Sequence, residues 1–445
     1  MKKEIAVLGA GESGTAAALL AIAKGYAVFV SDSGKIPDQN KREISSVGIE
    51  YEEGGHSFDR ILKATEVIKS PGIPDSAPVV AELLNRNIPV ISDIEFAWRY
   101  SNAFIIGVTG SNGKTTTSLW LYELLSRSGK DVVLAGNIGA SPCRTLIDSD
   151  PDYFVLEISS FQLDSIDKFK CDIAVLTNIT PDHLNRYNNS FEKYIASKFK
   201  IVKNSTLDDL FILCEDDKES MRYIENHTIE PKTVMFGLNS KNTFVDGDKL
   251  FVKYSERSFE MIASDIALPG THNLYNAMVV ALVGLKIDLP SAVIEMSLSL
   301  FKGVEHRMEF CGEYNGVKYY NDSKATNVNS TWYALESLDK NVVWIAGGFD
   351  KGNDYSELLD IVKEKVRLLI CMGVDNSKLE TFFSGIVPVE CTSSMKEVFD
   401  IIKKRAACGD VVLLSPACAS FDLFRSYQER GDQFKNYIRK IVESS

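Results

Sequence analysis

The residues whose types and spacing point most directly to chemistry form a glycine-rich stretch at Gly110–Thr116, with the sequence Gly-Ser-Asn-Gly-Lys-Thr-Thr. It follows an apolar run, Phe104–Val108, that predicts a strand, and it precedes a stretch, Ser118–Ser126, that predicts a helix. Exposed backbone amides at a helix N-terminus, with glycines that allow close approach, form an anion site. In such a phosphate loop we expect Lys114 to contact the β- and γ-phosphates of a nucleotide and the Thr115 hydroxyl to bind Mg²⁺.

This stretch is a variant of the usual phosphate-loop pattern, because Val108 stands where the first glycine belongs. A chance glycine-rich turn is the alternative interpretation, but strand, loop and helix all fall in the expected order. A phosphate loop alone fits motors, switches and kinases equally well, so the class of protein has to come from other residues.

Acidic and imidazole side chains follow the next predicted strands. Glu157 closes the apolar run Tyr153–Glu157, at the carboxyl end where these folds place a Mg²⁺ ligand, and His183 lies in the loop after Ile173–Leu176. A single Asp-His pair on a loop is usually a hydrogen-bonded turn. Beside a phosphate loop, metal or substrate contact becomes the favoured interpretation. Lys198 lies in a predicted helical segment and, taken alone, is typical of a solvated surface lysine.

A second glycine-rich turn, Gly9–Gly14, follows the predicted strand Ile5–Leu8, and Asp32 ends the next strand. This arrangement matches the dinucleotide fingerprint and, in isolation, favours an NAD-dependent oxidoreductase. Any nucleotide diphosphate needs the same backbone amides, however, and a dehydrogenase would leave the Gly110–Thr116 loop without a purpose. We therefore assign this turn to a UDP-linked diphosphate.

Four polar clusters occupy the last third of the chain, each where an α/β sheet would expose it on one rim. They are Glu305–Arg307, Tyr320–Asn327, Gly347–Gly352 and Ser415–Ser420. Three cationic residues in these clusters could bind anionic oxygens, namely Arg307, Lys324 and Lys351. Thr326 and Ser420 supply neutral hydrogen-bond donors. Any one cluster fits an ordinary polar loop, but four such loops together favour a binding site.

The elements that must position these residues are short apolar runs that alternate with amphipathic stretches, which indicates parallel α/β architecture. The further runs are Ala27–Val30, Phe154–Ile158, Val342–Ile345, Leu368–Met372 and Val411–Leu414. Alternation over Lys241–Phe259, around Asp246-Gly-Asp, predicts a β-hairpin. We expect three domains, at residues 1–97, 98–304 and 305–445.

Bulk properties narrow the class of protein. A chain of 445 residues is too long for one hydrophobic core, and 45% hydrophobic with 25% charged residues is a globular balance. The formal net charge of -12 argues against nucleic-acid and anionic-membrane partners. Eight scattered cysteines without metal-ligand spacing predict a reducing compartment, and no run approaches the roughly 20 apolar residues of a membrane span. A cytoplasmic location is therefore expected.

With these residues in view, the chain resembles the Mur ligase family from end to end. Motifs shared with the wider family are Thr109–Thr116, Gly136–Gly139, and His272-Asn273 with Asn276. Motifs closer to the D-glutamate-adding member are Leu156–Leu163, Asn321–Asn327 and Ser415–Ser420. The Asp-Asn-Pro-Arg tetrapeptide of the diaminopimelate- or lysine-adding relative is not found in the sequence.

The resemblance implies a Rossmann-like N-terminal domain for the UDP-substrate, a central phosphate-loop ATPase-like domain, and a Rossmann-like C-terminal domain for D-glutamate. It implies ATP-dependent joining of D-glutamate to UDP-N-acetylmuramoyl-L-alanine through an acyl phosphate, in peptidoglycan synthesis, by a monomer with ATP and two Mg²⁺ ions. Alternatives are a relative that adds another amino acid, a folylpolyglutamate-type ligase, an NAD-dependent dehydrogenase and a phosphate-loop switch.

The resemblance also assigns roles to residues. The implied catalytic residues are Lys114, His183 and Lys198. The implied metal-binding residues are Thr115, Glu157, His183 and Lys198, and the family's matching lysine carries a carbamate, which turns a cation into a metal-binding anion. For His183 we favour the metal role over that of a general base.

Three further sets bind substrates. The implied ATP-binding residues are Gly110, Ser111, Asn112, Gly113, Lys114, Thr115, Thr116, Asn273, Asn276, Arg307 and Asp322. The implied UDP-substrate contacts are Glu12, Ser13, Asp32, Ser33, Asn137 and His183. The implied D-glutamate contacts are Lys324, Thr326, Lys351, Ser420 and Tyr427.

Overall fold

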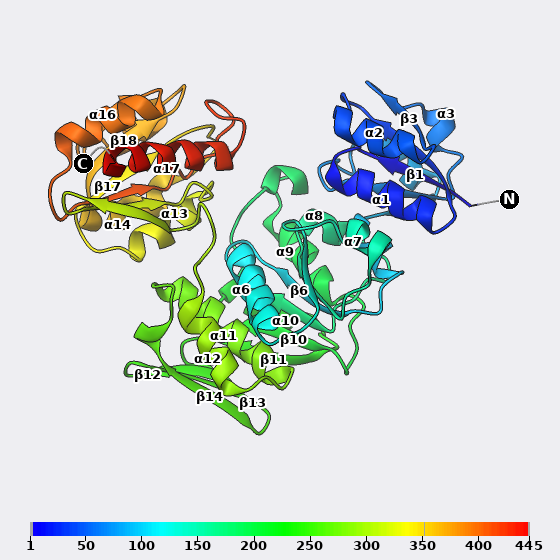
Figure 1. The fold of residues 1–445 in the computed structure, drawn as a ribbon, viewed down its shortest axis with the longest axis horizontal. Coiled ribbons are helices and arrows are strands. Elements are labelled where there is room, and N and C mark those ends of the chain that lie inside the picture. Colours follow the sequence, from blue (N-terminus) through cyan, green and yellow to red (C-terminus); the bar gives the residue numbers. More distant parts are fainter. Residues whose placement is uncertain (1–2, 351, 444–445) are drawn as a thin grey trace. The chain divides into compact units, whose positions relative to one another are not determined.

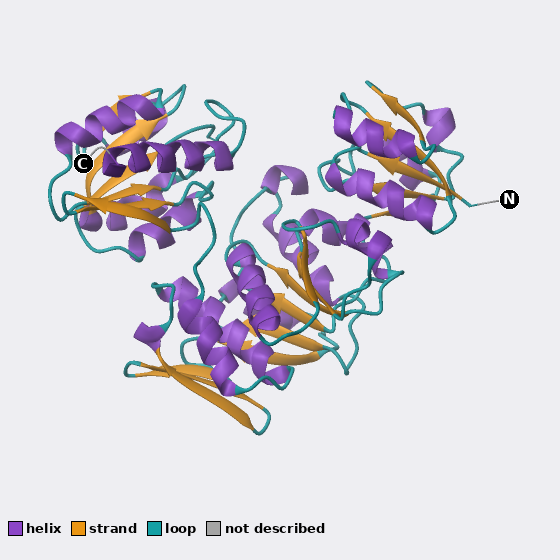
Figure 2. Cartoon of the chain, viewed as in Figure 1, coloured by secondary structure: helices purple, strands orange, loops and turns teal. Residues whose placement is uncertain are grey.

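The computed structural model describes residues 3–350 and 352–443. The chain divides into two compact units, one made of the residues up to Ala263 with Tyr275–Leu298, the other of Ser264–Leu274 with the residues from Ser299 on. Figures 1 and 2 show that both units are built of strands flanked by helices. Among the described residues, none of the helices combines the length and the apolar character that crossing a bilayer requires.

The first sheet of the first unit is parallel, with the strand order β3-β2-β1-β4-β5. Its elements are β1 (Glu4–Leu8), α1 (Glu12–Ala23), β2 (Ala27–Asp32), α2 (Asp38–Ser46), β3 (Glu50–Glu53), α3 (Phe58–Ile61), β4 (Glu66–Lys69), α4 (Pro78–Asn85), β5 (Val90–Ile91) and α5 (Asp93–Trp98). Alternate side chains of β1 enter different cores: Ile5 and Val7 pack with α1 and α5, whereas Ala6 and Leu8 pack with α3 and α4. Helices therefore cover both faces, as in a doubly wound sheet.

The second sheet of this unit is also parallel, with the strand order β11-β10-β9-β6-β8-β7. Its elements are β6 (Phe104–Thr109), α6 (Lys114–Arg127), β7 (Val132–Gly136), α7 (Pro142–Asp148), β8 (Tyr153–Glu157), α8 (Ser160–Asp164), β9 (Ile173–Leu176), η1 (Leu184–Tyr187), α9 (Phe191–Phe199), η2 (Lys200–Val202), β10 (Leu210–Cys214), α10 (Lys218–Asn226) and β11 (Lys232–Phe236). Because β6 lies between β8 and β9, the loops that follow these three strands meet at one edge of the sheet.

A small antiparallel sheet and three further helical elements follow in the chain. They are β12 (Thr243–Asp246), β13 (Lys249–Tyr254), β14 (Arg257–Ile262), η3 (Ala263–Asp265), α11 (Thr271–Lys286) and α12 (Ser291–Leu300). The predicted hairpin over Lys241–Phe259 is confirmed as β12 and β13, and β14 adds a third strand that the sequence analysis did not separate.

The sheet of the second unit has the strand order β15-β16-β20-β17-β18-β19, and only the β15–β16 pair is antiparallel. Its elements are β15 (Glu309–Tyr314), β16 (Val317–Asn321), α13 (Val328–Glu336), β17 (Val342–Ala346), η4 (Tyr355–Leu358), α14 (Leu359–Lys365), β18 (Val366–Met372), α15 (Ser377–Phe383), β19 (Val389–Thr392), α16 (Met395–Arg405), β20 (Val411–Leu414) and α17 (Tyr427–Glu443). Trp344 packs with α13 and α15 on one face, and Ile345 packs with α16 and α17 on the other.

The predicted fold class is confirmed, because three largely parallel sheets carry helices on their faces. Every apolar run that predicted a strand forms one, and the observed ends lie within two residues of the predicted ends. The domain limits at residues 97 and 304 stay a prediction.

The N-terminal glycine turn depends on a close approach between strand and helix. Gly9 has a φ of 88°, and a Cβ atom at Gly14 would lie 1.8 Å from the Gly9 carbonyl oxygen. Gly11 has nothing within 4 Å of its Cβ position. The third glycine therefore lets α1 begin against the end of β1.

We expect Gly14→Ala to lower the free energy of unfolding by about 1–3 kcal/mol, because overpacking here outweighs the better helix propensity of alanine. Gly11→Ala is the matched control, since its methyl group meets open space. Thermal unfolding of both full-length variants tests this. Equal melting temperatures would show that α1 does not need the contact.

Candidate active site

The phosphate loop joins β6 to α6 at the carboxyl edge of the central sheet. Gly110 has a φ of 146° and Gly113 has a φ of 80°, conformations that residues with side chains rarely adopt. A Cβ atom at Gly110 would also lie 1.9 Å from the Thr177 hydroxyl. Position 110 therefore requires glycine for reasons of both conformation and space.

The loop after β9 holds the phosphate loop in place. The Ser111 amide donates to the Asn178 carbonyl (2.8 Å), and the Asn112 amide donates to Asn178 Oδ1 (2.9 Å). The Ser111 hydroxyl donates to the Thr180 carbonyl (2.8 Å). These two amides are therefore engaged within the protein, and three hydrogen bonds tie the loop to the segment after β9.

Two lysine amines converge on one carbonyl of the loop. Lys114 Nζ donates to the carbonyls of Gly110 (2.7 Å) and Ser111 (2.8 Å), and Lys198 Nζ donates to the same Gly110 carbonyl (2.7 Å). Lys198 is 2% exposed. Burial, and next the charge of Lys114, hold the pKa of Lys198 well below its ordinary value. The expectation that Lys198, taken alone, is a solvated surface lysine is therefore wrong.

A hydroxyl, a carboxylate and an amide meet beside the loop. The Thr115 hydroxyl donates to Glu157 Oε2 (2.7 Å), and Asn137 Nδ2 donates to Glu157 Oε1 (2.7 Å). Glu157 is only 1% exposed. The strand pairing explains the meeting, because Glu157 is opposite Val108 on β6 and opposite Gly136 on β7.

This oxygen cluster fits Mg²⁺. Among residues 3–350 and 352–443, no group of three His, Cys, Asp or Glu side chains could hold a metal ion. Mg²⁺, however, is usually held by one or two protein oxygens together with waters and phosphate oxygens. Thr115 in the first turn of α6 and Glu157 at the end of β8 supply two such oxygens, next to the loop that would hold the phosphates.

His183 precedes η1 in the segment after β9, and Tyr194 lies on α9. His183 has a φ of 52°, its side chain is 44% exposed, and its Nε2 lies 3.6 Å from Asp182. The buried Tyr194 hydroxyl lies 3.1 Å from the Ser111 hydroxyl, and Lys198 Nζ lies 4.6 Å from the Tyr194 ring centroid. The sequence analysis did not single out Tyr194. Its signal is its position one helical turn before Lys198, on the same face of α9.

The remaining predicted ATP-binding residues of the central region lie on α6 and α11. Thr116 is buried in the first turn of α6. Asn276 Oδ1 accepts from the Thr117 hydroxyl (3.0 Å) and would lie 2.8 Å from a Cβ atom at Gly113. Asn273 Nδ2 donates to the Pro269 carbonyl (2.8 Å). Asn276 thus touches the phosphate loop directly.

Four of the six predicted UDP-substrate contacts lie at the first sheet, whereas Asn137 and His183 follow strands of the second sheet. Asp32 Oδ2 accepts from the Ala10 amide (2.7 Å), and Oδ1 accepts from the Gly34 amide (2.8 Å), so Asp32 shapes the glycine turn itself. Glu12 is exposed and pairs with Arg144 (3.2 Å). Ser13 is half-buried and Ser33 is exposed.

In the second unit, Asp322 follows β16 and faces Arg307. Asp322 is buried, and its carboxyl group accepts hydrogen bonds from the Ser415 hydroxyl (2.8 Å) and the Met308 amide (3.2 Å). Burial raises the pKa of the Asp322 carboxyl to about 7, against the opposing charge of Arg307. Burial and the same arginine lower the pKa of His272 to about 4. Arg307 Nε is buried without a hydrogen-bond partner in the described part of the chain. A buried donor of this kind is suited to bind an acceptor group of a ligand.

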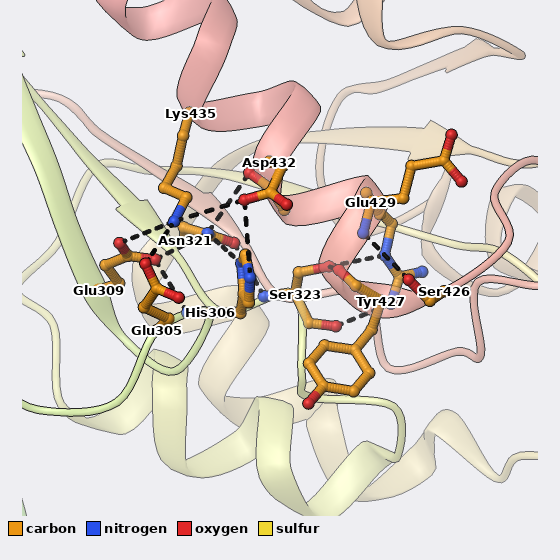
Figure 3. Close-up of polar contacts among 12 residues, drawn as sticks. Glu305, His306, Glu309, Asn321, Ser323, Ser426, Tyr427, Glu429, Asp432 and Lys435 are labelled. Atoms are coloured by element: carbon orange, nitrogen blue, oxygen red, sulfur yellow. Dashed lines mark hydrogen bonds and ion pairs between the residues drawn. The ribbon is translucent and has the colours of Figure 1, made fainter. Parts of the chain in front are cut away.

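The turn that carries Arg307 is fixed by a buried polar cluster (Figure 3). His306 has a φ of 62°, its Nδ1 lies 2.9 Å from Asn321 Nδ2, and its carbonyl accepts from the Lys324 amide (3.0 Å). Lys435 on α17 pairs with Glu309 (3.2 Å). This cluster ties the turn to the end of β16 and to α17.

Three of the predicted D-glutamate contacts, Lys324, Thr326 and Ser420, lie on loops at the carboxyl edge of this sheet, and Tyr427 begins α17. Lys324 Nζ lies 5.6 Å from the Tyr427 ring centroid. Thr326 is half-buried before α13, and Ser420 is 2% exposed. Lys351 lies outside the described residues.

Arg430 on α17 joins these loops, and the sequence analysis did not identify it. It is 1% exposed, and its guanidinium donates to the Ser323 carbonyl (2.8 Å) and to the Cys418 carbonyl (3.2 Å). Burial lowers the pKa of Arg430 to about 10. The Ser323 hydroxyl in turn donates to the Tyr427 carbonyl (2.8 Å; Figure 3). An arginine in a polar helix gives no sequence signal for such burial.

A phosphate loop backed by a buried acid and a buried lysine, in a chain of largely parallel sheets, defines a nucleotide-dependent α/β enzyme. Family comparisons agree along the chain. Residues 3–92 match the Mur ligase MurD-like N-terminal domain, residues 108–284 the Mur ligase middle domain, and residues 306–418 the Mur ligase glutamate ligase domain.

Full-length relatives are also found. The UDP-N-acetylmuramoylalanine–D-glutamate ligase of Porphyromonas gingivalis is 48% identical and covers 99% of both chains. The enzyme of the same name from Christiangramia forsetii is 46% identical over 99% of this chain and 100% of its own. The chain therefore belongs to the Mur ligase family, and it is an ATP-dependent ligase that forms amide bonds.

Solved structures share the fold. The UDP-N-acetylmuramate–alanine ligase of Thermotoga maritima has a TM-score of 0.62 at 18% identity, with 100% of both chains covered. The Thermotoga maritima MurF ligase in complex with ADP has a TM-score of 0.60 at 17% identity, with 87% of this chain and 91% of that chain covered. At these identities the likeness shows the three-domain fold alone.

Titration of Asp322 predicts a pH effect. Its pKa rises from 3.8 in an unfolded chain to about 7, so the native state holds a proton that the unfolded state releases. The free energy of unfolding therefore decreases as pH rises from about 4 to about 7, the range between the two pKa values. Asp322→Asn cannot ionise, so we expect its stability relative to wild type to increase between pH 4.5 and 8, measured by urea unfolding.

Asp375→Asn is the matched control in the same unit. The Ser377 hydroxyl and amide hold the pKa of Asp375 below its ordinary value, so its wild-type contribution to stability runs in the opposite direction. A relative stability of Asp322→Asn that is constant across the pH range would contradict the burial argument.

Proposed function

We propose that this enzyme joins D-glutamate to UDP-N-acetylmuramoyl-L-alanine, with conversion of ATP to ADP and phosphate, in peptidoglycan synthesis. The observation that carries the proposal is the full-length identity of nearly half to relatives with that name. Lys114 on the Gly110 carbonyl supports it, because it places a cationic group beside the loop that would hold the ATP phosphates.

The first step makes a poor electrophile reactive. A carboxylate oxygen of the L-alanine residue attacks the γ-phosphorus, and ADP leaves, which gives an acyl phosphate. Bringing a carboxylate to a triphosphate sets anions together, and Lys114 offsets that repulsion. Thr115 and Glu157 would hold Mg²⁺, which supplies further positive charge to the phosphate oxygens.

The second step forms the amide. The neutral D-glutamate amine attacks the acyl carbon, and phosphate leaves with the proton that the amine loses. Arg307, Lys324, Lys351, Thr326, Ser420 and Tyr427 are the proposed residues for anionic and polar groups of ATP and D-glutamate in this part of the chain. Ser323 and Cys418, which Arg430 joins through their carbonyls, border two of the loops that carry them.

The proposal also divides the chain. Residues 1–97 would bind the UDP end through Glu12, Ser13, Asp32 and Ser33, with Asn137 and His183 nearer the muramoyl part. Residues 98–304 would bind ATP, and residues 305–445 would bind D-glutamate.

Since each substrate has candidate residues within one chain, a monomer suffices. Because ATP and UDP-linked precursors are cytoplasmic metabolites, a cytoplasmic enzyme is proposed.

Lys198 is proposed to carry a carbamate. Carbamate formation needs a neutral amine to attack CO₂, and the buried amine with a lowered pKa meets that need. The product would be anionic beside Lys114 and would offer oxygen ligands, together with His183, for a second Mg²⁺.

Phosphate release with single amino acids tests the proposed function. With ATP and UDP-N-acetylmuramoyl-L-alanine, we expect D-glutamate to support turnover, and L-glutamate, L-lysine and L-alanine to give a rate lower by at least about 100-fold, since a misplaced carboxylate leaves buried cations unpaired. Lys114→Ala should abolish ADP formation. Equal use of another amino acid would assign the enzyme to a different member of the family.

Chemical rescue tests the carbamate. We expect Lys198→Ala to lose most activity and to regain part of it with added formate or acetate, whose carboxylate replaces the carbamate. Lys200→Ala is the matched control, because Lys200 lies nearby on the chain but pairs with Asp164 instead (2.8 Å). Absence of rescue at any carboxylate concentration would argue against the carbamate and leave the ligase assignment intact.

A further inference from the structure

A serine, a glutamate and a histidine form a small network at the end of β2 and β3 that none of the roles above includes. The Ser31 hydroxyl lies 2.6 Å from Glu52 Oε1 and 2.6 Å from His56 Nδ1. Ser31 is fully buried, whereas His56 is half-buried. Glu52 Oε1 also accepts from the Ser57 amide (2.8 Å).

This network decides the tautomer of His56. A serine hydroxyl has one proton, and an ionised glutamate can only accept, so the Ser31 proton goes to Glu52. Burial raises the pKa of Glu52, but the hydrogen bonds from Ser31 and Ser57 and the nearby His56 outweigh it, and the pKa is held below its ordinary value. The Ser31 oxygen then accepts from His56 Nδ1–H. The Nε2 atom of neutral His56 is therefore left as an acceptor.

The network lies against the N-terminal glycine turn. The Gly9 amide donates to the Ser31 carbonyl (2.9 Å), and the Ala10 amide donates to Asp32 Oδ2 (2.7 Å). The segment after β3 is tied to the same place, because the Gly54 amide donates to the Gly34 carbonyl (3.0 Å). The loops after β1, β2 and β3 thus form one continuous rim.

The spacing of neighbouring strands sets the distance along this rim from the glycine turn to the end of β3. Adjacent strands lie about 4.8 Å apart, so the end of β3 is about 10 Å from the end of β1 across β2. A ribose and base can span this length when their diphosphate lies at the glycine turn. Both Asp32 oxygens already accept backbone amides, whereas the Ser31 hydroxyl engages His56 through Nδ1 and not through Nε2.

We propose that His56 contacts the nucleoside end of the UDP-linked substrate through Nε2, with Ser31 and Glu52 as the positioning residues that fix its ring. The ligand class is a nucleoside diphosphate, and the partner of Nε2 is an N–H or O–H group of its base or ribose. This inference rests on the proposed function, since it names a specificity residue for the same substrate.

Two isosteric substitutions separate a ligand role from a structural one. An asparagine side chain can replace Nδ1 and keep the bond to Ser31, whereas a glutamine side chain reaches the place of Nε2. We expect His56→Ala and His56→Asn to raise the KM for UDP-N-acetylmuramoyl-L-alanine about tenfold, the effect of one lost hydrogen bond. The kcat and the KM values for ATP and D-glutamate should not change, and His56→Gln should stay close to wild type.

A binding measurement makes the test independent of turnover. Calorimetry of the full chain with UDP, in saturating ADP so that the phosphate loop is blocked, should show the same order of affinities. His227→Ala is the matched control, because His227 is exposed after α10 and stacks on Tyr223. Unchanged UDP affinity in His56→Ala, or recovery by asparagine rather than glutamine, would overturn the role of His56. Absence of UDP binding by the wild-type chain would instead overturn the proposed substrate.

Discussion

The active-site chemistry depends on one constraint, the placement of β6 between β8 and β9 in a parallel sheet. Parallel neighbours end at the same edge, so the phosphate loop, Glu157 and the Thr177–His183 segment must lie together. The register then sets the detail, because the pairing of Val108 with Glu157 brings a carboxylate to the Thr115 hydroxyl. No residue in this cluster could be moved to another strand without losing its partners.

This arrangement brings two lysine amines to one backbone carbonyl. Lys114 and Lys198 both donate to the Gly110 carbonyl, and Lys198 is 2% exposed there. Burial and the charge of Lys114 hold the pKa of Lys198 well below its ordinary value, which favours the neutral amine over the ammonium form. The phosphate loop thus holds a half-buried and a fully buried lysine amine beside each other.

Residues that touch no proposed substrate hold the binding loops of the second unit. Arg430 joins the Ser323 and Cys418 carbonyls, and Lys435 with His306 fixes the turn that carries Arg307. Arg430 and Lys435 both lie on α17, the C-terminal helix of the described residues. Bonds from a charged guanidinium to carbonyls are stronger than neutral ones, which suits loops that must keep their shape when an anionic ligand arrives.

Much of this protein could be predicted from its sequence. Apolar runs with turn residues at their ends located the strands, and the glycine loops with Lys114, Thr115 and Glu157 were recognisable because glycine, lysine and acid occur at fixed offsets from those strands. The resemblance carried by the Asn321–Asn327 and Ser415–Ser420 motifs supplied the expected substrates. These signals are local, and a local signal survives in a linear sequence.

Other features were decided only by the tertiary structure. Lys198 and Arg430 have the sequence surroundings of solvated residues, yet both are buried, because distant loops fold over them. The Asp32 oxygens accept the amides of Ala10 in the glycine turn and of Gly34 after β2, and the Ser31–Glu52–His56 network joins two strands. Burial and cross-strand hydrogen bonds depend on which segments become neighbours in space. The residue types in the sequence determined which chemical groups were available. Long-range packing determined which of these side chains are buried away from water and which form hydrogen bonds with one another.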